Sequence, residues 1–180
     1  DEFNILMICD EVMTGWGRTG KMFAFENFDV KPDIVTFAKG VTCGYVQLGG
    51  VVVSKEIAAY FDDNLLSCGL TYSGHPLACA AGVACVNYYE EADVLTNVNK
   101  VGKVLGEKLE AMKASHPCVG DVRYIGLFSA IELVKDKGTK EPLVPYGKDP
   151  EGIMGKIIGL LKERKFMTYS HENMILVAPP

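Results

Sequence analysis

Two residues of opposite charge, Asp10 and Lys39, each follow directly on an apolar run that predicts a buried strand. The run before Asp10 covers residues 4–9, and the run before Lys39 covers residues 34–38. Neither run alternates with polar residues, which is typical of strands buried on both faces in a parallel sheet. Ligands of open α/β sheets bind at the carboxyl ends of the strands, so we expect both charged side chains to face a ligand site.

The chemistry open to this pair depends on the state of the lysine. Burial lowers the pKa of a lysine, and the neutral amine can then condense with an aldehyde to form a Schiff base. A nearby aspartate can keep a pyridine nitrogen protonated, as pyridoxal phosphate (PLP) requires to act as an electron sink. The structural alternative is that Asp10 and Lys39 pair with each other, because an unpaired charge at the edge of a core costs free energy.

The elements that would position these residues predict an α/β domain over residues 1–92. We expect a Gly-rich loop at residues 15–20, a short helix at 23–28, a strand at 51–53, a helix from the N-cap Ser54 to about Phe61, and an Ala-rich helix at 76–89. Most strands of this domain should belong to one mainly parallel sheet.

From residue 93 onward the pattern changes, and we expect a small, incomplete α+β domain over residues 93–180. Its expected elements are a helix at 94–114, two strands between 119 and 134 broken at Gly126, a polar solvated loop at 135–149, a helix at 150–164, and short strands near Met167 and Ile175.

Composition narrows the class of protein further. The 180 residues carry 18 Lys and Arg against 23 Asp and Glu, a net charge of −5, which offers no basic surface for nucleic acid. No apolar run approaches the roughly 20 residues that a membrane-spanning helix needs. The six cysteines form no Cys-X-X-Cys pair and the three histidines are far apart, so we expect no metal site. We expect reduced, mostly buried thiols in a cytoplasmic protein.

Four motifs, taken in order, resemble the signature series of the class III PLP-dependent aminotransferases. They are Asp10-Glu-Val-Met-Thr-Gly-Trp-Gly-Arg-Thr-Gly20, Pro32-Asp-Ile34, Ala38-Lys-Gly40 and Thr71-Tyr-Ser-Gly-His-Pro76. Several linked motifs are more specific than any single one, and the similarity continues to the terminal Pro-Pro. The sequence lacks an initiator Met, and family members are usually more than twice as long, so we expect the C-terminal part of such an enzyme.

The resemblance implies a PLP-dependent fold type I enzyme and a role for each matching residue. Lys39 would form the Schiff base with PLP and move a proton between the substrate carbon and the cofactor carbon. Asp10 would bind the pyridine nitrogen, and Val12 would pack on one face of the ring. Thr71 would bind the cofactor phosphate from the partner subunit, which makes a homodimer the catalytic unit. A hydroxyl just before a helix also suits a phosphate on physical grounds.

Two departures from the family pattern bear on the substrates, an amino donor and a 2-oxo acid. Met13 stands where many relatives have a Gln that donates a hydrogen bond to the cofactor's ring oxygen, and a thioether cannot donate. Leu176 stands where members that act on α-amino acids or acetylornithine often carry an Arg that binds a carboxylate. The sequence therefore resembles the branch that uses ω-amines, β-alanine-like donors or taurine, with pyruvate or 2-oxoglutarate as acceptor.

For the other residues of these segments we expect structural roles. They are turn chemistry for Gly15, Gly17 and Gly20, loop order for Arg18, packing for Trp16, the start of a helix for His75 and a strand position for Glu132.

Two further interpretations stay open. An aminomutase or decarboxylating enzyme of the same fold would keep Asp10, Lys39 and Thr71, and product analysis would separate it from an aminotransferase. A non-catalytic remnant or interaction module is disfavoured by these intact residues and favoured by the short length. The family's Ser-Gly phosphate-binding segment and covering aromatic ring lie upstream of residue 1, so a molecule of only this length should show weak or no catalysis.

Overall fold

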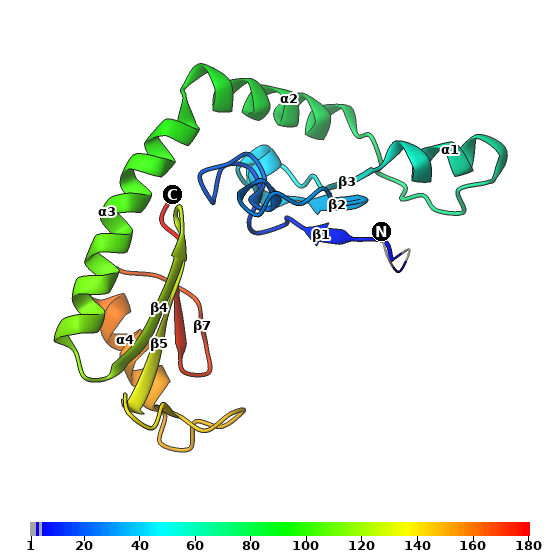
Figure 1. Cartoon of the computed structure of the whole chain (residues 1–180). Coiled ribbons are helices and arrows are strands. Elements are labelled where there is room, and N and C mark those ends of the chain that lie inside the picture. Colours follow the sequence, from blue (N-terminus) through cyan, green and yellow to red (C-terminus); the bar gives the residue numbers. More distant parts are fainter. Residues whose placement is uncertain (1–2, 4) are drawn as a thin grey trace. The chain divides into compact units, whose positions relative to one another are not determined.

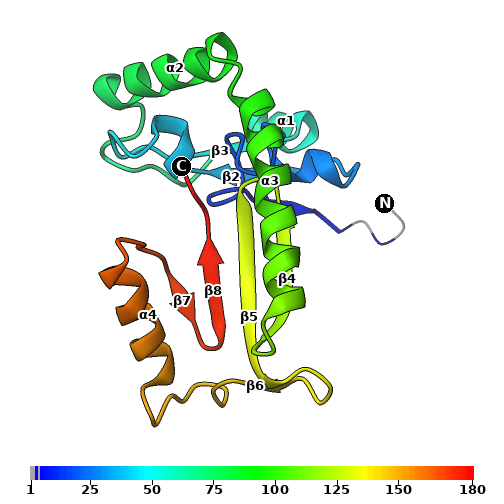
Figure 2. The ribbon, with the colours of Figure 1, turned by 90° about the vertical axis from the view of Figure 1, so that its left-hand side faces the viewer.

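The computed structural model describes residue 3 and residues 5–180 of the chain (Figure 1 and Figure 2). The chain falls into two compact units, Asp1–Asn97 and Val98–Pro180, each with its own sheet. The domain division expected after residue 92 lies inside the first unit and stays a prediction.

A three-stranded sheet in the order β1-β2-β3 is the framework of the first unit. Its strands are β1 (Ile8–Asp10), β2 (Ile34–Phe37) and β3 (Gly50–Val53). β1 runs parallel to β2, whereas β3 runs antiparallel to β2. The direction of β3 departs from the parallel sheet expected over residues 1–92, and a mainly parallel sheet for the domain as a whole stays a prediction. The link from β2 to β3 contains only the 3-10 helix η2 (Lys39–Thr42), and a parallel crossover usually needs an α-helix.

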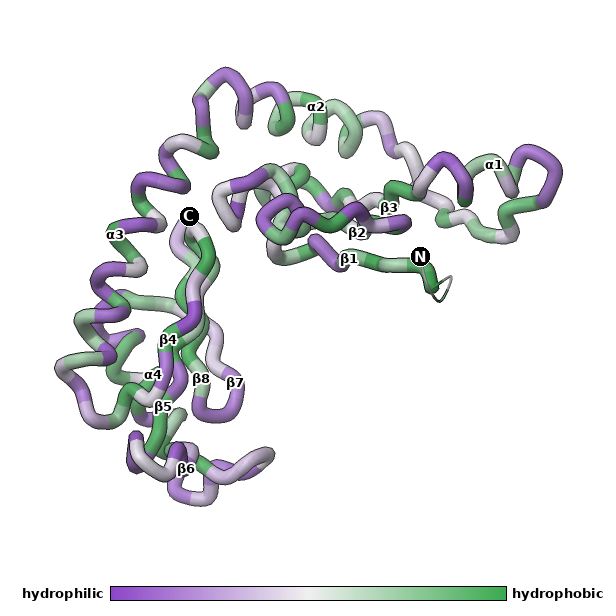
Figure 3. The backbone as a smooth tube through the Cα atoms, viewed as in Figure 1, coloured by the Kyte–Doolittle hydropathy of each residue, from purple (hydrophilic) through white to green (hydrophobic). Residues whose placement is uncertain are grey.

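The strands of this sheet are more exposed than their apolar sequences predict. Val35 in β2 is buried, but Ile8 of β1 is 62% exposed and Val51 of β3 is 63% exposed. The hydrophobic colouring of β1 and β3 in Figure 3 therefore falls on uncovered strands. The prediction that residues 4–9 form a strand buried on both faces is wrong, because nothing in the described part of the chain covers β1. Residue 4 itself lies outside the described residues.

The short helices of the first unit lie at their predicted positions. Ser54 caps α1 (Lys55–Asp63), because its hydroxyl oxygen accepts a 3.3 Å hydrogen bond from the backbone N–H of Ile57. The helix expected at residues 23–28 is the 3-10 helix η1 (Ala24–Asn27).

The long helix of the first unit is α2 (Pro76–Glu91), as the Ala-rich run predicts. It begins at a proline, whose fixed φ suits the first turn of a helix. α2 packs against η2 and so supports the segment that starts with Lys39.

The second unit is an antiparallel sheet with two helices that share its core (Figure 2). Its strands lie in the order β4-β5-β8-β7, and β6 pairs with β5. Its elements are α3 (Val94–Ser115), which begins in the first unit, β4 (Val119–Ile125), β5 (Phe128–Asp136), β6 (Glu141–Pro142), α4 (Ile153–Glu163), β7 (Ser170–His171) and β8 (Met174–Val177). Leu109 of α3 and Met154 of α4 join one hydrophobic core with the sheet. The buried sheet residues of this core are Val119, Val122, Ile131, Leu133 and Ile175.

Most predictions for the second unit are confirmed, and two are wrong. Gly126, with a φ of 57°, separates β4 from β5, and α3, α4 and β8 lie where they are expected. The loop predicted as solvated at residues 135–149 contains β6, and its Val144 is only 3% exposed because it enters the core. The strand predicted near Met167 is also wrong: Met167 is 81% exposed, and β7 forms later, where its backbone pairs with β8.

All six cysteines are free, as expected, but the prediction of mostly buried thiols is wrong. Cys9 and Cys85 are partly buried, and the exposed ones are Cys43, Cys68, Cys79 and Cys118. Among the described residues, no helix combines the length and the apolar character that crossing a membrane requires.

Substitution of Gly102 by Ala should destabilise the second unit. A Cβ at this position of α3 would lie 2.7 Å from the carbonyl oxygen of Gly126, and a backbone atom cannot move aside as a side-chain tip can. We expect the free energy of unfolding, measured by urea denaturation, to fall by about 1–3 kcal/mol.

Gly155→Ala in α4 is the matched control, because nothing lies within 4 Å of its Cβ position. The helix propensity of Ala should there raise the free energy of unfolding by about 0.5–1 kcal/mol. Equal effects of the two substitutions would contradict the close approach of α3 to the Gly126 turn.

Candidate functional site

Asp10 ends β1 at the edge of the first sheet, with its carboxylate held from one side. Its Oδ1 accepts hydrogen bonds from the backbone N–H of Val12, at 3.0 Å, and from the hydroxyl of Thr36, at 3.3 Å. Thr36 is the residue opposite Asp10 in the parallel pairing. Within residues 3 and 5–180, Oδ2 accepts no hydrogen bond, and the side chain is exposed. A further donor can therefore reach this oxygen.

Lys39 follows β2 at the same edge and opens η2. Its φ is 45°, in the left-handed region that non-glycine residues rarely adopt. The Lys39 side chain is exposed, and nothing among the described residues covers it. The structural alternative of an ion pair with Asp10 is also not observed among the described residues. Both charged groups are thus available to a ligand.

The structure brings three of the four predicted site residues to one edge and leaves the fourth apart. Val12 is half-buried and lies two residues beyond Asp10, with its N–H bonded to that carboxylate. Thr71 lies in the exposed connection between α1 and α2. Among the hydrogen bonds of the described residues, none joins Thr71 to Asp10, Val12 or Lys39. The functional roles of these four residues stay predictions.

A buried carboxylate beside the predicted site was not assigned a role from the sequence. Glu11 is 3% exposed and accepts hydrogen bonds from the Thr14 hydroxyl, at 2.5 Å, and from the backbone N–H of Phe25, at 2.9 Å. Its backbone oxygen also accepts a hydrogen bond from the N–H of Gly15. These bonds tie the Gly-rich loop to the end of β1, so Glu11 orders the segment that follows Asp10. In the sequence, only its position next to Asp10 indicated that Glu11 could matter for the site.

Trp16 packs as predicted, and it carries the contact of the Gly-rich loop with Gly40 of η2. Its ring centroid is 5.3 Å from that of Phe23, 5.3 Å from that of Phe37 and 6.2 Å from that of Tyr89. The indole nitrogen is buried without a hydrogen-bond partner among the described residues, so Trp16 acts here through packing alone. The expected turn chemistry of the neighbouring glycines is confirmed at Gly17, whose φ is 86°.

Tyr89 is a second residue that sequence analysis missed. Its hydroxyl donates a 2.9 Å hydrogen bond to the carbonyl oxygen of Gly40, the residue after Lys39. Burial raises the pKa of Tyr89 far above its ordinary value of 10.0, with the neighbouring Cys43 thiol adding to the shift. The hydroxyl therefore stays protonated and acts as a donor at neutral pH. Its position near the end of an Ala-rich helix carried no signal for this contact.

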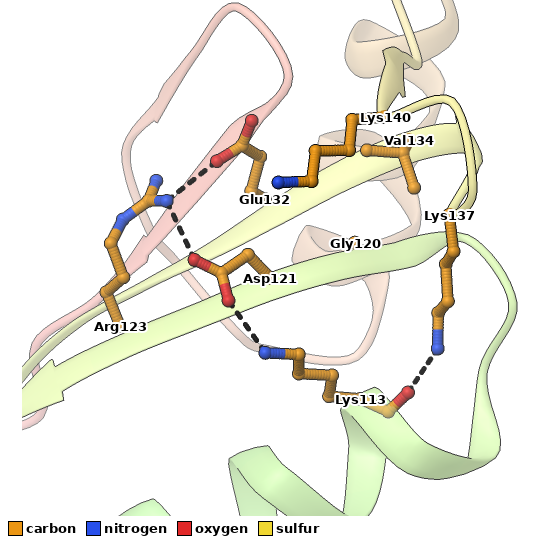
Figure 4. A pocket seen from close by; sticks show the side chains of 8 residues that line it. All are labelled: Lys113, Gly120, Asp121, Arg123, Glu132, Val134, Lys137 and Lys140. Carbon is orange, nitrogen blue, oxygen red and sulfur yellow. Dashed lines mark hydrogen bonds and ion pairs between the residues drawn. The ribbon is translucent and has the colours of Figure 1, made fainter.

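A separate pocket of about 360 Å³ lies in the second unit and is lined by charged side chains (Figure 4). Asp121 pairs with Lys113 at 2.7 Å and with Arg123 at 2.9 Å, and Arg123 also pairs with Glu132 at 2.8 Å. Lys137 donates a hydrogen bond to the carbonyl oxygen of Lys113. The carboxylates of this pocket are thus occupied by neighbouring cations, and Glu132 has the structural strand position that the sequence predicts.

Metal chemistry has no candidate ligand set in the part of the chain that the structure describes. Over these residues, no three His, Cys, Asp or Glu side chains gather closely enough to hold a metal ion.

Comparisons with known proteins place the sequence in context. A protein-family model described as aminotransferase class-III matches residues 1–179. A taurine–pyruvate aminotransferase of Bilophila wadsworthia is 38% identical over 174 residues, a match that covers 91% of this chain and 36% of that protein.

Two solved structures are similar over almost the whole chain. The taurine:2-oxoglutarate aminotransferase from Bifidobacterium kashiwanohense, in complex with PLP and glutamate, is 58% identical, with a TM-score of 0.96 over 100% of this chain and 40% of that one. A thermostable (S)-enantioselective omega-transaminase from Thermomicrobium roseum is 40% identical, with a TM-score of 0.90 over 99% of this chain and 39% of that one. The chain thus spans between 36% and 40% of the length of these three proteins.

The ion pairs of Asp121 predict a small, pH-dependent contribution to stability. The hydrogen bond from Lys113 holds the pKa of Asp121 below its ordinary value of 3.8, and Arg123 adds to this effect. A carboxyl whose pKa is lowered by folding stabilises the fold above its unfolded pKa, and that stabilisation is lost as the pH falls through the folded pKa. Because these side chains are more than a third exposed, Asp121→Asn should cost only about 0.5 kcal/mol at pH 7.

Urea denaturation of wild type and Asp121→Asn at low salt, at pH 7 and well below pH 4, checks this prediction. The difference in unfolding free energy should be present at pH 7 and vanish in acid. Glu163→Gln, at an exposed position near the end of α4, is the control and should show no such pH dependence. A difference for Asp121→Asn that persists in acid would contradict the ion-pair origin.

Proposed function

This chain belongs to the class III aminotransferases, and we propose that the protein transfers an amino group from an ω-amine, β-amino acid or taurine-like donor to a 2-oxo acid. The observation that carries the proposal is the geometry at one sheet edge. The parallel neighbours β1 and β2 end there, β1 in Asp10 and β2 just before Lys39. The fold supports the proposal in its coarser form, as a mixed α/β structure that matches PLP-dependent fold type I aminotransferases. Which portion of each domain the chain represents stays a prediction.

PLP is the cofactor that this set of side chains fits. Within residues 3 and 5–180, Asp10 has one carboxylate oxygen that accepts no hydrogen bond and can face a protonated pyridine nitrogen, and Lys39 has an amine outside any ion pair that can meet an aldehyde. Val12 offers a half-buried apolar surface to one face of the ring. When bound, PLP supplies an electron sink for the charge that develops at the donor's carbon as its proton leaves. A relative of this chain was solved with PLP bound, which supports the same cofactor here.

Asp10 has the role of keeping the pyridine nitrogen protonated, because a carboxylate stabilises the charged form of a neighbouring base. The two donors on its Oδ1, Val12 N–H and Thr36 hydroxyl, fix the direction of the other oxygen. The carboxylate is therefore oriented before any ligand arrives, which lowers the entropy that binding must offset.

Lys39 has two roles at different times. Its amine would hold the cofactor covalently at the aldehyde carbon until a donor binds. Once free, the same amine would act as a general base and acid for the proton on the donor's carbon. The left-handed φ of Lys39 supports a functional role, because strained backbone persists where a site requires it.

Thr71 is proposed to bind the cofactor phosphate of a second subunit in a homodimer. The loop that carries it exposes apolar side chains, with Leu65 at 87%, Leu70 at 81% and Tyr72 at 80%. Contiguous exposed apolar residues mark protein contact surfaces rather than solvated loops. This loop therefore suits burial against a partner subunit. There the Thr71 hydroxyl and the backbone N–H groups of the loop can bind the phosphate of the partner's cofactor.

The absence of an arginine at position 176 supports a donor without an α-carboxylate. Leu176 lies in β8 opposite Ala130, and an aliphatic side chain cannot bind a carboxylate as an arginine does. Met13 is 50% exposed and has no donor for a ring oxygen. The similarity to two taurine aminotransferases favours a donor whose acid group is a sulfonate or lies far from the amine.

Borohydride trapping should attach PLP to Lys39 alone. The full-length protein that contains this sequence is incubated with PLP and treated with borohydride, which makes the link to lysine permanent. The protein is then digested, and the labelled peptide is located by its mass. Lys39→Ala should remove essentially all of the label. Lys31→Ala, at an exposed position before β2, is the matched control and should leave the label on the Lys39 peptide. Label scattered over surface lysines, or a folded chain without label, would overturn the proposed cofactor chemistry.

Donor competition should reveal a preference for amines without an α-carboxylate. We expect rates with taurine, β-alanine or an aromatic amine to exceed the rate with ornithine by about tenfold or more, because the charge-assisted bond of an arginine is missing. Pyruvate and 2-oxoglutarate serve as acceptors in parallel assays. Leu176→Arg should raise the relative rate with the α-amino acid. A wild-type preference for the α-amino acid would contradict the proposed donor class.

A further inference from the structure

The turn that begins at Lys39 is strained and needs support from outside its own sequence. Lys39 has a φ of 45°, and Cys43, which ends η2, has a φ of 50°. Non-glycine residues adopt this region at a cost in free energy, and they keep it only where surrounding contacts hold the backbone. Within the turn, Val41 N–H bonds to the carbonyl of Ala38, and Cys43 N–H bonds to that of Gly40. Both bonds join residues three apart and are 3.2 Å long, at the upper end of the usual range, so they are weak anchors for such a conformation.

Tyr89 supplies a contact from a distant part of the chain. It lies on α2, 49 positions along the sequence from Gly40, and its hydroxyl donates a 2.9 Å hydrogen bond to the Gly40 carbonyl oxygen. That carbonyl belongs to the second peptide unit after the Lys39 Cα. A donor fixed on a packed helix therefore restrains the rotation of the backbone immediately after Lys39.

Trp16 closes on Gly40 from another direction. A Cβ on Gly40 would lie only 2.6 Å from the Cβ of Trp16, so the tryptophan packs directly against the Gly40 backbone. The rings of Trp16 and Tyr89 stack at 6.2 Å with an interplanar angle of 27°. Gly40 thus lies in a clamp formed by the Trp16 side chain and the Tyr89 hydroxyl. The next two residues, Val41 and Thr42, are buried and hold the far end of the turn.

The other polar groups around the Tyr89 hydroxyl do not replace this bond. The Cys43 sulfur is 3.4 Å from the hydroxyl oxygen and 3.7 Å from the Gly40 oxygen, and a thiol is a weak donor. The Cys85 thiol and Arg18 act on the pKa of Tyr89 through charge effects, Cys85 raising it and Arg18 lowering it. Tyr89 is therefore the strong side-chain donor to the Gly40 carbonyl.

We propose that Tyr89 is a positioning residue for Lys39: its hydroxyl, together with the packing of Trp16 on Gly40, holds the turn that aims the lysine amine at the cofactor. This inference rests on the proposed function, because it assigns Tyr89 a role toward the amine that binds PLP. Tyr89 would act without touching substrate or cofactor. Its effect passes through the backbone of Gly40.

Tyr89→Phe tests the inference, because it removes the hydroxyl and keeps the ring against Trp16. Tyr88→Phe is the matched control, because Tyr88 directly precedes Tyr89 on α2 and its side chain is 63% exposed. Each variant of the full-length protein is titrated with PLP, trapped with borohydride and, in a separate measurement, unfolded in urea. The absorbance of the lysine-bound cofactor is also followed against pH.

We expect Tyr89→Phe to bind PLP about fivefold more weakly, the equilibrium effect of one ordinary hydrogen bond. The pH midpoint of the absorbance change should move by about 0.7 unit, the same fivefold expressed on a pH scale. The urea midpoint should stay close to that of Tyr88→Phe. Gly40→Ala, which forces the clamp open from the side of Trp16, should weaken PLP binding by at least as much.

The outcomes separate this inference from the proposed function. If the wild-type chain is not labelled at Lys39, the proposed function fails and the role of Tyr89 fails with it. If the wild type is labelled but Tyr89→Phe matches Tyr88→Phe in affinity and pH midpoint, the inference about Tyr89 alone is overturned. A lower urea midpoint with an unmoved pH midpoint would make Tyr89 merely structural and would also overturn it. Wild-type PLP affinity in Gly40→Ala would do the same.

Discussion

The parallel pairing of β1 with β2 is the interaction on which the candidate site depends. It sets Asp10 opposite Thr36 and continues in a 2.8 Å hydrogen bond from the N–H of Glu11 to the carbonyl of Thr36. Side chains alternate between the two faces along a strand, so a slip of one residue would exchange Asp10 for Glu11 at the open face. The register of one short ladder thus decides which of two adjacent carboxylates is buried in the loop and which is open to a ligand.

Features that depend on neighbours in the sequence were predicted well. The apolar run before Lys39 predicted β2, Ser54 predicted the start of α1, and Gly126 predicted the break between β4 and β5. Each of these signals is local, because caps, turns and strand periodicity act within a few residues. The placement of Asp10 and Lys39 at one edge followed from the rule that parallel strands end on the same side.

Features that depend on what covers an element could not be predicted in the same way. An apolar run shows that a strand can be buried, but burial requires a partner surface, and β1 has none among the described residues. The contact of Tyr89 with Gly40 joins positions that are 49 apart, and no local pattern marks either end of it. The antiparallel direction of β3 was also not predicted. Its physical reason is that the link from β2 to β3 has no α-helix of the kind a parallel crossover usually needs.

The uncovered first sheet has a consequence for what its two outer strands can bind. β1 and β3 are the edge strands of that sheet, and each presents unpaired backbone groups beside exposed apolar side chains such as Ile8 and Val51. Edges of this kind are templates on which further strands add, unless charges, prolines or bulges blunt them. The charged residue Asp10 blunts only the end of β1, and β3 consists of Gly50 and three valines. Within the described residues, these two edges are therefore the positions at which further strands of the same sheet can add.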